Sequence, residues 1–355
     1  MKVLLLTHSG RQDSSSRIRF LQYLPFFKQQ GIQVDVSQLL SDEYVSAIVL
    51  GKSKQSLWSL ILLGYWNRVK ILFKVKNYDL IIIHKEIFPY IPAFVERLLC
   101  FIGIIYIVDY DDATFHNYDK HNNWLVRLLL GKKIDAIMRF SNTVIIGNRY
   151  LSSRAQLSGA NQIEIIPSVV DLNKYKVVKS NCNKQLVVGW IGSPSTGKYL
   201  LEIESIYKLL ASEFDVRFVA VGCNKETVKE LPIEVLPWSE ETEVQLIQSF
   251  DVGIMPLTNS LWEKGKCGYK LIQYMACELP VVASPIGVNK QIIENGKNGF
   301  LAQEPDEWVG ALRQLLNDES LRRFMGENGR KLVEEEYSLQ VQSKKFEKII
   351  YEVVN

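Results

Sequence analysis

The sequence predicts an α/β protein built from two doubly wound parallel sheets, one in each of two domains that face one another across a cleft. Short apolar runs alternate with helical segments along the chain, as in folds whose parallel strands are joined by crossover helices. The alternation restarts after a polar stretch near residue 180. The chain has 355 residues, which suits two domains of about 150 residues each better than one core.

The first half contains five predicted strands. The first is KVLLL, which ends in the small polar residues THSG. A helix follows in SSSRIRFLQYLPFFKQQG, where a serine can cap the N-terminus, Pro25 kinks or divides the helix and Gly31 ends it. The other buried strands, with helical segments between them, are predicted in IQVDV, YDLIIIH, GIIYIVD and NTVIIG.

The second half repeats this pattern after a polar stretch from Val177 to Lys184 that is predicted to be a linker. QLVVGWIGSPSTG again gives a strand, a glycine turn and the start of a helix. Further strands are predicted in DVRFVAVG, IEVLPW, FDVGIMPL and LPVVAS. We therefore expect a first domain at residues 1–178, a second at 179–338, and a last helix in 339–355 that packs back on the first domain.

The composition argues against several classes of protein. The formal net charge is +3 and no basic run occurs, so we expect no nucleic acid partner. The five cysteines are scattered without a C-x-x-C pair, which argues against a disulfide framework and favours a reducing cytoplasm. The first apolar run is too short for a signal peptide, and the stretch from Leu98 to Val108 is about half a membrane span. We expect a cytoplasmic protein without a transmembrane segment.

Two glycine turns follow strands and precede helices, so their backbone N–H groups are candidates for binding an anion. The first turn is HSGRQDSSSR around Gly10, and the second is WIGSPSTGK around Gly192 and Ser193. Neither matches G-x-G-x-x-G or the Walker pattern, which argues against a dinucleotide dehydrogenase and a P-loop NTPase. Lys198 falls in a first helical turn, where the helix dipole disfavours a cation unless an anion is bound. Alternatively, the glycines only turn the chain and Lys198 is a solvated surface residue.

The stretch KCGYKLIQYMA places several polar groups at the start of another helix. Lys266 and Lys270 flank Gly268, and two cations at this end of a helix favour a bound diphosphate. Gln273 lies about one turn further and is a candidate for hydrogen bonds to sugar hydroxyls. The alternative is a solvated helix start. The predicted donor-binding residues of this stretch are Lys266, Cys267, Gly268, Tyr269, Lys270 and Gln273.

Polar side chains also follow predicted strands of the first domain. Asp109, Asp111, Asp112 and His116 lie in IVDYDDATFH and are candidates for acid, base or hydrogen-bonding roles in catalysis. Asp111 and Asp112 could instead cap the next helix. No second carboxylate or histidine cluster has convincing metal-binding spacing, so we expect no metal.

The segment IIIHKEIFPY presents His84, Lys85 and Glu86 at another strand end. Here we expect Glu86 to be catalytic and His84 to be structural. Arg17 and Arg19, near the start of the first helix, are candidates for binding a phosphate of an acceptor, and a surface role is the alternative.

The stretch from Leu57 to Lys76 combines apolar residues and two tryptophans with an arginine and three lysines. Such a helix can lie on an anionic membrane surface, where lipid-linked acceptors occur. Core packing of the apolar face, with lysines that extend to solvent, is the simpler interpretation.

The segment KLIQYMACELPVVASPIGVNKQIIENGKNGFL resembles the donor-binding region of the retaining GT-B glycosyltransferases, the family called glycosyl transferases group 1. SSSRIRFLQYLP and IIPSVVDLNKY extend the resemblance, more loosely, across the first half. The resemblance implies two Rossmann-like domains and no metal requirement. It also implies transfer of a sugar from a nucleotide-sugar to a hydroxyl acceptor with retention of anomeric configuration.

The sequence departs from this family at three positions. Gln273 and Gly265 stand where two glutamates are usual, and Ser193 replaces the usual arginine, while Lys198 matches the family's lysine. Glu263 is two positions early and is a candidate to compensate for the glutamate missing at 265. A subset of the family with G-K-C-x-x-K uses lysines more heavily, and this chain looks like that subset.

The function that these features predict is polysaccharide synthesis. We expect the acceptor to be a growing glycan that can be lipid-linked. A lipid-linked acceptor would bring the enzyme to the inner face of the membrane as a peripheral protein. Trp238 is a candidate to flank the nucleotide base, and a packed tryptophan is the alternative. Two other functions stay open: a nucleotide-sugar epimerase of the same fold, and a non-catalytic nucleotide-binding protein of two domains.

Overall fold

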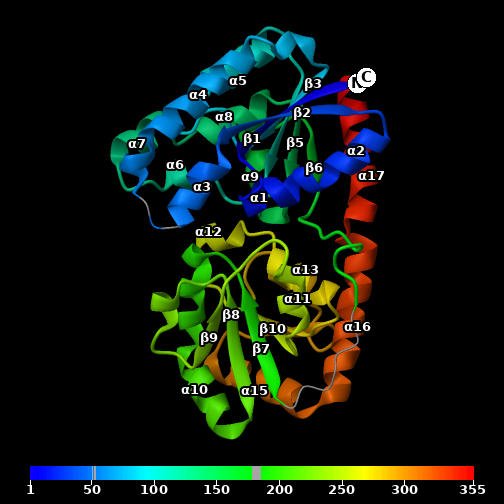
Figure 1. Ribbon diagram of the computed structural model, residues 1–355. Coiled ribbons are helices and arrows are strands. Elements are labelled where there is room, and N and C mark those ends of the chain that lie inside the picture. Colours follow the sequence, from blue (N-terminus) through cyan, green and yellow to red (C-terminus); the bar gives the residue numbers. More distant parts are fainter. Residues whose placement is uncertain (50, 52, 178–184) are drawn as a thin grey trace. The chain divides into compact units, whose positions relative to one another are not determined.

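The computed structural model describes residues 1–49, 51, 53–177 and 185–355, and these form two compact units (Figure 1). Unit 1 comprises residues 1–168, 265–267 and 342–355, and unit 2 comprises residues 169–264 and 268–341. The chain thus passes between the units more often than a single linker requires. Most of the predicted linker, at residues 178–184, lies outside the described residues.

Unit 1 contains a parallel sheet of six strands in the order β2-β1-β3-β4-β5-β6. β3 and β4 are buried along their whole length because helices cover both faces, which explains their continuous apolar runs LIIIH and YIVDY. The strands are β1 (Lys2–Ser9), β2 (Gln33–Leu40), β3 (Leu80–His84), β4 (Tyr106–Tyr110), β5 (Thr143–Ile146) and β6 (Ile163–Ile165).

The helices of unit 1 connect these strands. The helix expected around Pro25 is divided: α1 ends at Arg19, a short 3₁₀ turn follows, and Pro25 lies in the first turn of α2, where it needs no hydrogen-bond donor. The α-helices are α1 (Ser14–Arg19), α2 (Leu24–Gln29), α3 (Asp42–Val49), α4 (Trp58–Leu72), α5 (Phe94–Phe101), α6 (His116–Asp119), α7 (Trp124–Leu130), α8 (Lys133–Phe140) and α9 (Arg149–Ser158).

Unit 2 contains a second parallel sheet of six strands, in the order β12-β11-β10-β7-β8-β9. The two sheets confirm the predicted α/β fold class with two doubly wound parallel sheets. The strands are β7 (Leu186–Ile191), β8 (Val216–Val221), β9 (Ile233–Leu236), β10 (Val252–Met255), β11 (Val281–Ala283) and β12 (Gly299–Leu301).

A side chain from a helix bridges the two central strands of this second sheet where their pairing ends. β7 and β10 pair only at Val188–Val252 and Gly189–Gly253. Beyond these pairs the hydroxyl of Tyr274 accepts from the N–H of Ile191 at 2.9 Å and donates to the carbonyl of Ile254 at 3.3 Å. Gly253 permits this close approach, because a Cβ there would collide with the Tyr274 ring. The Tyr274 side chain therefore fixes its helix, α13 (Tyr269–Ala276), against the carboxyl ends of both strands.

The α-helices of unit 2 flank this sheet, and the long helix α16 packs against α13. Arg330 of α16 donates to the carbonyl of Ala276 at 2.5 Å and so caps the C-terminus of α13. The helices are α10 (Glu204–Glu213), α11 (Glu243–Gln248), α12 (Leu261–Lys264), α13 (Tyr269–Ala276), α14 (Asn289–Ile292), α15 (Pro305–Asn317) and α16 (Glu319–Glu336), with a 3₁₀ segment at Pro194–Ile203.

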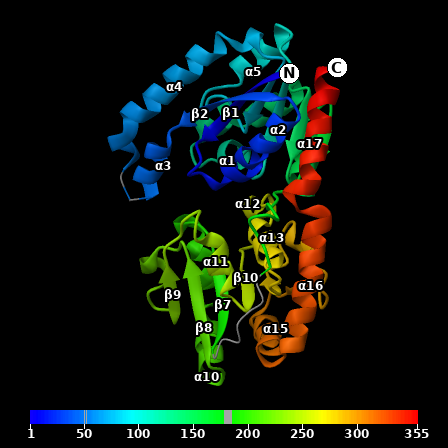
Figure 2. The same cartoon turned by 45° about the vertical axis from the view of Figure 1, so that its right-hand side comes forward.

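The last helix, α17 (Leu339–Val354), contributes most of its length to unit 1, beside α2 in Figures 1 and 2. Phe346 is fully buried there. Its ring lies 5.3 Å from those of Tyr23 and Phe27 and 6.5 Å from that of Phe20, measured between centroids. Edge-to-face contacts of this kind add to the stabilisation that burial of the ring provides. No helix of the described residues is long and apolar enough to cross a membrane.

We predict that Phe346→Ala lowers the free energy of unfolding by about 3–5 kcal/mol, because it leaves a cavity among three aromatic rings. Urea denaturation followed by fluorescence measures this. Tyr351→Ala, at an exposed position of the same helix, is the control and is expected to cost less than about 1 kcal/mol. Equal losses in the two variants would show that α17 is not held by the Phe346 cluster.

Candidate functional site

Each unit has one place where the order of its strands reverses. In unit 1 this point lies between β1 and β3, and in unit 2 it lies between β7 and β10. Ligands of open α/β sheets bind at the carboxyl ends of the strands beside this reversal, because the connecting loops diverge there. The residues that follow β1 and β3 in unit 1, and β7 and β10 in unit 2, are therefore the candidates for function.

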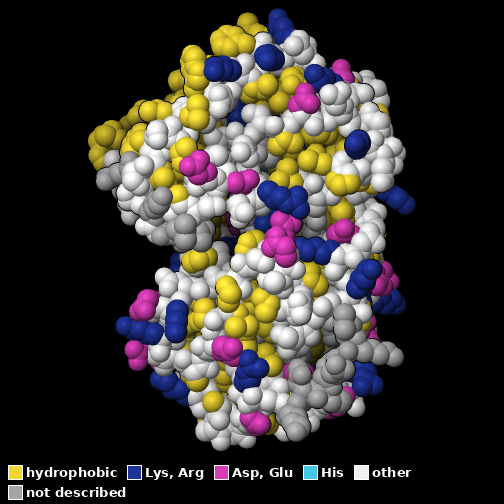
Figure 3. Space-filling view, viewed as in Figure 1, with side chains coloured by type: hydrophobic (Ala, Val, Ile, Leu, Met, Phe, Trp, Pro, Cys, Tyr) yellow, Lys and Arg dark blue, Asp and Glu magenta, His cyan; other side chains and the backbone are white. Residues whose placement is uncertain are grey.

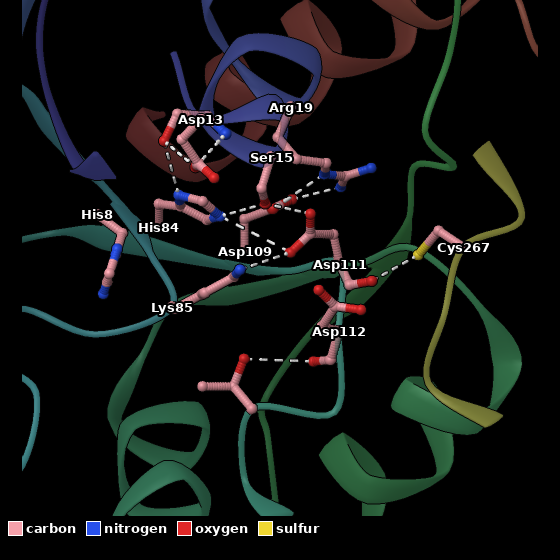
Figure 4. A network of polar contacts seen from close by, with 12 residues as sticks. His8, Asp13, Ser15, Arg19, His84, Lys85, Asp109, Asp111, Asp112 and Cys267 are labelled. Atoms are coloured by element: carbon pink, nitrogen blue, oxygen red, sulfur yellow. Dashed lines mark hydrogen bonds and ion pairs between the residues drawn. The ribbon is translucent and has the colours of Figure 1, made fainter. Parts of the chain in front are cut away.

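In unit 1 a cluster of polar side chains occupies this position (Figure 4). His84, the last residue of β3, approaches the Ser15 hydroxyl at 3.0 Å, and Ser15 donates to a carboxylate oxygen of Asp111. The ammonium of Lys85 lies 3.2 Å from Asp111 Oδ1. These residues come from α1, β3 and the end of β4, so the fold brings together groups that are far apart in the sequence. We call His84, Lys85, Ser15, Asp111 and Asp112 the unit 1 cluster.

The two adjacent carboxyl groups of this cluster differ in acidity. Burial would raise the pKa of Asp111, but Lys85 and His84 outweigh it and hold that pKa well below its usual range. The pKa of Asp112 is raised, first by burial and then by the negative charge of Asp111, although Lys85 and Lys266 partly oppose this. The pair thus combines a carboxylate that stays ionised with one that gains a proton more readily, an arrangement typical of acid–base sites.

Lys85 is held in the cluster by the backbone. Its φ of 69° is in the left-handed region, which a non-glycine residue adopts at a cost of order 1 kcal/mol. Its N–H donates to the carbonyl of Asp109 at 3.0 Å. Nearby, burial and the charge of Lys85 lower the pKa of His8 to about 3, so that His8 is neutral at pH 7. Lys85, which directly follows β3, therefore supplies a positive charge beside Asp111.

Asp109 and Arg19, which we predicted to be catalytic and acceptor-binding, form a buried ion pair. Arg19 Nε donates to Asp109 Oδ1 at 3.0 Å, and Nη1 donates to the carbonyl of Ile166 at 2.7 Å. Both side chains are almost inaccessible to solvent. Arg17 is also buried, and its guanidinium donates to the carbonyl of Arg11 at 3.1 Å. Both arginines thus bind carboxylate or carbonyl groups of the protein itself.

Glu86 and His116 also bind partners within unit 1. Glu86, which we predicted to be catalytic, is buried, pairs with the ammonium of Lys133 and accepts from the Tyr118 hydroxyl at 2.8 Å. His116 contacts Asp119 at 2.8 Å through Nδ1 and the Tyr150 hydroxyl at 2.8 Å through Nε2. Both nitrogens of His116 are engaged, and the geometry favours a structural role for this residue as well.

Residues 265–267 belong to unit 1, whereas we expected them in the second domain. The Asn148 amide donates to the carbonyls of Gly265 and Lys266 at 2.8 and 3.0 Å, and the Cys267 thiol donates to the carbonyl of Asp111 at 3.0 Å. A Cβ at position 265 would lie 2.6–2.7 Å from atoms of Ala113, closer than real contacts allow. Close packing thus explains why a glycine stands where the family has a glutamate. Glu263, the candidate replacement, is buried and accepts from the hydroxyls of Tyr199 and Ser260.

In the two glycine turns, several N–H groups donate within the protein. In the first, the N–H of Gln12 donates to the Asp42 carboxylate at 2.8 Å, and this carboxylate also fills the space beside Gly10. In the second, the N–H of Gly192 donates to the carbonyl of Val221 at 3.0 Å, and that of Ser193 donates to the Thr196 hydroxyl at 3.1 Å. Another candidate for an anion site is the start of α13.

At the start of α13, Gly268 has a φ of 66° and supplies no side chain to cap the helix. The first turn contains no acidic residue, but it contains Lys270, whose ammonium lies 5.0 Å from the centre of the Trp190 ring. The same ring packs beneath Gly192, where a Cβ would collide with it. Trp190 therefore holds Lys270 beside the turn that follows β7. Lys198, in contrast, is exposed and lies 5.3 Å from the Tyr199 ring.

Gln273 is buried in a chain of hydrogen bonds that the sequence did not indicate. Its amide donates to the Tyr175 hydroxyl at 2.7 Å, and this hydroxyl donates to Glu243 at 3.2 Å. The Trp238 indole N–H also donates to Glu243, at 3.1 Å. A hydroxyl has one proton, so Tyr175 can serve two carboxylates only if one of them is protonated. Glutamine at 273, rather than the family's glutamate, removes this conflict.

Unit 2 also has a hollow of about 210 Å³ that no predicted donor residue lines. Leu257, Ser284 and Gln303, which follow β10, β11 and β12, contribute to its wall. Among the described residues, no group of three or more His, Cys, Asp or Glu side chains is placed to hold a metal ion.

Comparisons with known proteins agree with this geometry. Residues 185–318 match the family model of glycosyl transferases group 1. N-acetyl-alpha-D-glucosaminyl L-malate synthase of Bacillus anthracis is 24% identical over 276 residues, which are 65% of this chain and 71% of that protein. Capsular polysaccharide biosynthesis glycosyltransferase CapM of Staphylococcus aureus is 26% identical over 173 residues, 45% of this chain and 44% of that protein.

Among solved structures, Anabaena Alr3699/HepE in complex with UDP-glucose superposes with a TM-score of 0.73 at 16% identity, covering 99% of this chain and 100% of that one. The fold is therefore GT-B. Residues 185–318 form a glycosyl transferases group 1 domain.

We predict that Gln273→Glu destabilises the protein increasingly as pH rises from 5 to 8. Beside Tyr175 and Glu243, the pKa of the new carboxyl should be raised above that of the unfolded chain, so its ionisation opposes folding. A loss of about 1–3 kcal/mol is expected at pH 8 and little at pH 5. Gln245→Glu, at an exposed position of α11, is the control for thermal melts at both pH values. A pH-independent difference between the variants would contradict the hydrogen-bond chain.

Proposed function

We propose that the chain is a retaining glycosyltransferase that moves a sugar from a nucleotide-sugar donor to a hydroxyl group of a glycan. The observation that carries the proposal is the cation at the start of α13. A lysine in a first helical turn is unfavourable beside the positive end of the helix dipole, and this turn holds no acidic residue to offset it. A diphosphate bound there removes the repulsion and can accept hydrogen bonds from N–H groups of the first helical turn.

The same charges promote the reaction. The bond between the anomeric carbon and the leaving phosphate oxygen breaks while a bond to the acceptor oxygen forms, and the proton of the acceptor hydroxyl passes to the departing diphosphate. Negative charge then grows on the diphosphate, where Lys270 and the helix start stabilise it. With positive charge already present, we propose that no metal is required, and turnover in the presence of EDTA tests this. The UDP-glucose complex of the structurally similar Anabaena protein makes uridine diphosphate sugars the first donors to test.

For the acceptor we propose the unit 1 cluster. Ser15, His84 and the two carboxyl groups of Asp111 and Asp112 lie together at the strand ends of this unit and offer donors and acceptors suited to sugar hydroxyls. The name of the related CapM protein, which refers to capsular polysaccharide biosynthesis, supports a growing glycan as the acceptor. A lipid-linked glycan is the form we propose, with the enzyme working at the cytoplasmic side of the membrane.

We predict that Lys270→Met lowers kcat/KM and donor affinity together, by roughly 10- to 100-fold, because one charge-assisted contact of about 1.5–3 kcal/mol is lost. Methionine keeps much of the packing on Trp190. The measurement combines release of nucleoside diphosphate, from a panel of nucleotide-sugars with glycan acceptors, with thermal shifts by the same nucleotides. Lys208→Met, at an exposed position of α10, is the matched control.

The outcomes of this assay separate the candidate functions. Unchanged activity in Lys270→Met would refute the role of the α13 start. Conversion of the donor sugar without an acceptor would identify a nucleotide-sugar epimerase instead. Nucleotide binding without product from any donor and acceptor would favour a non-catalytic binding protein.

A second prediction concerns Asp111 and Asp112. The pKa of Asp111 is depressed in the fold, so its ionised form stabilises the protein above the unfolded pKa of about 4, and Asp111→Asn should lower the melting temperature at pH 7. The pKa of Asp112 is raised, so its ionisation costs stability at pH 7, and Asp112→Asn should leave the melting temperature unchanged or raise it. We expect turnover to fall in both variants.

Melting curves and turnover per folded molecule distinguish the two roles. If Asp112→Asn melts lower than the wild type but turns over normally, Asp112 is a structural cap and the proposed acceptor site is wrong.

A further inference from the structure

The helix α4 places a charged residue and a glycine on its inner side. On its inner side Arg68 is completely buried and donates to the carbonyls of Thr7 and Ser37 at 2.6 and 3.0 Å. Gly64, on the same side, lies so close to the carbonyl of Leu39 that no side chain would fit. A charged residue and a glycine therefore face the sheet, where a surface helix normally places its large apolar side chains.

The outer side of α4 carries the apolar residues. Trp58, Leu62 and Trp66 recur every four positions and are 56–61% exposed, and Phe73, directly after the helix, is 86% exposed. This spacing places the three helical residues on one face. The core packing of α4 that we gave as the simpler interpretation of its sequence is thus wrong for its large apolar side chains.

Two more helices of unit 1 expose apolar residues in the same way. Phe101 of α5 is 89% exposed, and Leu128 and Leu129 of α7 are each 70% exposed. With α4 they define what we call the apolar face. Its exposed members are Trp58, Leu62, Leu63, Trp66, Phe73, Tyr90, Ile91, Phe94, Leu98, Phe101, Ile102, Trp124, Leu125, Leu128 and Leu129.

One loop connects the three helices. The Phe88 ring lies 5.4 Å from that of Tyr65 in α4, and the Tyr65 hydroxyl donates to the carbonyl of Pro89 at 2.9 Å. Tyr90, with a φ of 58°, packs 5.5 Å from Tyr118 of α6, next to α7. The loop continues directly into α5. In Figure 1, α4, α5 and α7 lie along the outer edge of unit 1, and Figure 3 shows apolar side chains gathered over that edge.

The charges of this face have one sign. The segments 53–77, 88–105 and 120–133 contain a single carboxylate, Glu96, which is buried and accepts from the N–H of Ile87 at 3.0 Å. The exposed charged residues of these described segments are all basic. They include Lys70, which lies 5.3 Å from the Trp66 ring, and also Lys74, Lys76, Arg97, Lys120, Arg127 and Lys132.

We propose that the apolar face docks on the surface of an anionic lipid bilayer. Exposed tryptophan, phenylalanine and leucine side chains bordered by lysine and arginine match the apolar–headgroup boundary of such a membrane. An interface with another protein is usually depleted in lysine, so the lysines favour lipid as the occupant. The helices lie on the membrane and do not cross it, because none of the described helices is long and apolar enough. This binding goes beyond sugar transfer and does not depend on it.

Sedimentation with vesicles tests the proposal. The full chain is mixed with phosphatidylcholine vesicles that contain about one third phosphatidylglycerol, and with vesicles of phosphatidylcholine alone. We expect the protein to sediment with the anionic vesicles and much less with the neutral ones. Raising the salt to about 1 M, where the Debye length is about 3 Å, should weaken the binding.

One variant places an acid on each helix: Trp66→Glu, Phe101→Glu and Leu128→Glu combined. We expect its partition into anionic vesicles to fall at least about tenfold, because each change removes apolar contact and adds repulsion. Phe324→Glu, at a 52% exposed position of α16 in unit 2, is the matched control and should bind like the wild type. If the triple variant melts early, Lys70→Gln, Lys74→Gln and Lys76→Gln combined provide a second test, because these surface changes reduce only the charge.

Three results would overturn the proposal. The first is no binding of the wild type to anionic vesicles, and the second is an equal loss of binding in Phe324→Glu. The third is a dimer, detected by light scattering, that the triple variant dissociates, since a second copy would then cover the apolar face. A wild-type level of transfer to a soluble acceptor by the triple variant would separate membrane docking from the proposed function.

Discussion

The buried pair of Arg19 and Asp109 is the interaction on which the arrangement of unit 1 depends. Both side chains are almost inaccessible to solvent, and burying two charges is costly unless their geometry and remaining hydrogen bonds are satisfied. Arg19 meets this condition by donating also to the carbonyl of Ile166. The pair fixes the end of α1 to β4, and Ser15, one turn earlier on α1, then meets both His84 and Asp111. A structural charge pair thus positions the polar groups of the cluster beside it.

In unit 2, neutral side chains rather than an ion pair fix a helix to the sheet. The Tyr274 hydroxyl joins α13 to the diverging ends of β7 and β10, and Gln273, its neighbour in the sequence, joins the helix to Tyr175. Because these side chains are neutral, they do not offset the positive end of the helix dipole. This favours anion binding at the start of the helix. Replacement of a carboxylate by an amide at position 273 is therefore consistent with a donor site that relies on lysine and on the helix itself.

The alternation of apolar runs and helices predicted five of the six strands in each sheet, because most of these parallel strands have a local apolar pattern, but it missed the short strands β6 and β12. The site was harder to predict. Acidic residues at strand ends were the signal for Asp109, Glu86 and Asp111 alike, but only contacts distant in sequence tell them apart: Arg19 neutralises the first and Lys133 the second. The close approach of Ala113 that excludes a side chain at Gly265 is equally invisible in the sequence. No motif in the sequence indicated Ser15, which contacts both His84 and Asp111.

The discontinuous path of the chain has a consequence for synthesis. The Phe346 ring fills the space among Phe20, Tyr23 and Phe27, yet it is made after almost all of unit 2. At about 5–20 residues per second, the ribosome needs roughly 10–40 s to pass from Ser168 to Phe346. Throughout this interval the three aromatic rings of the earlier segment lack their partner. The aromatic core of unit 1 can therefore be completed only after nearly all of unit 2 has been synthesised, although the sequence of unit 1 begins first.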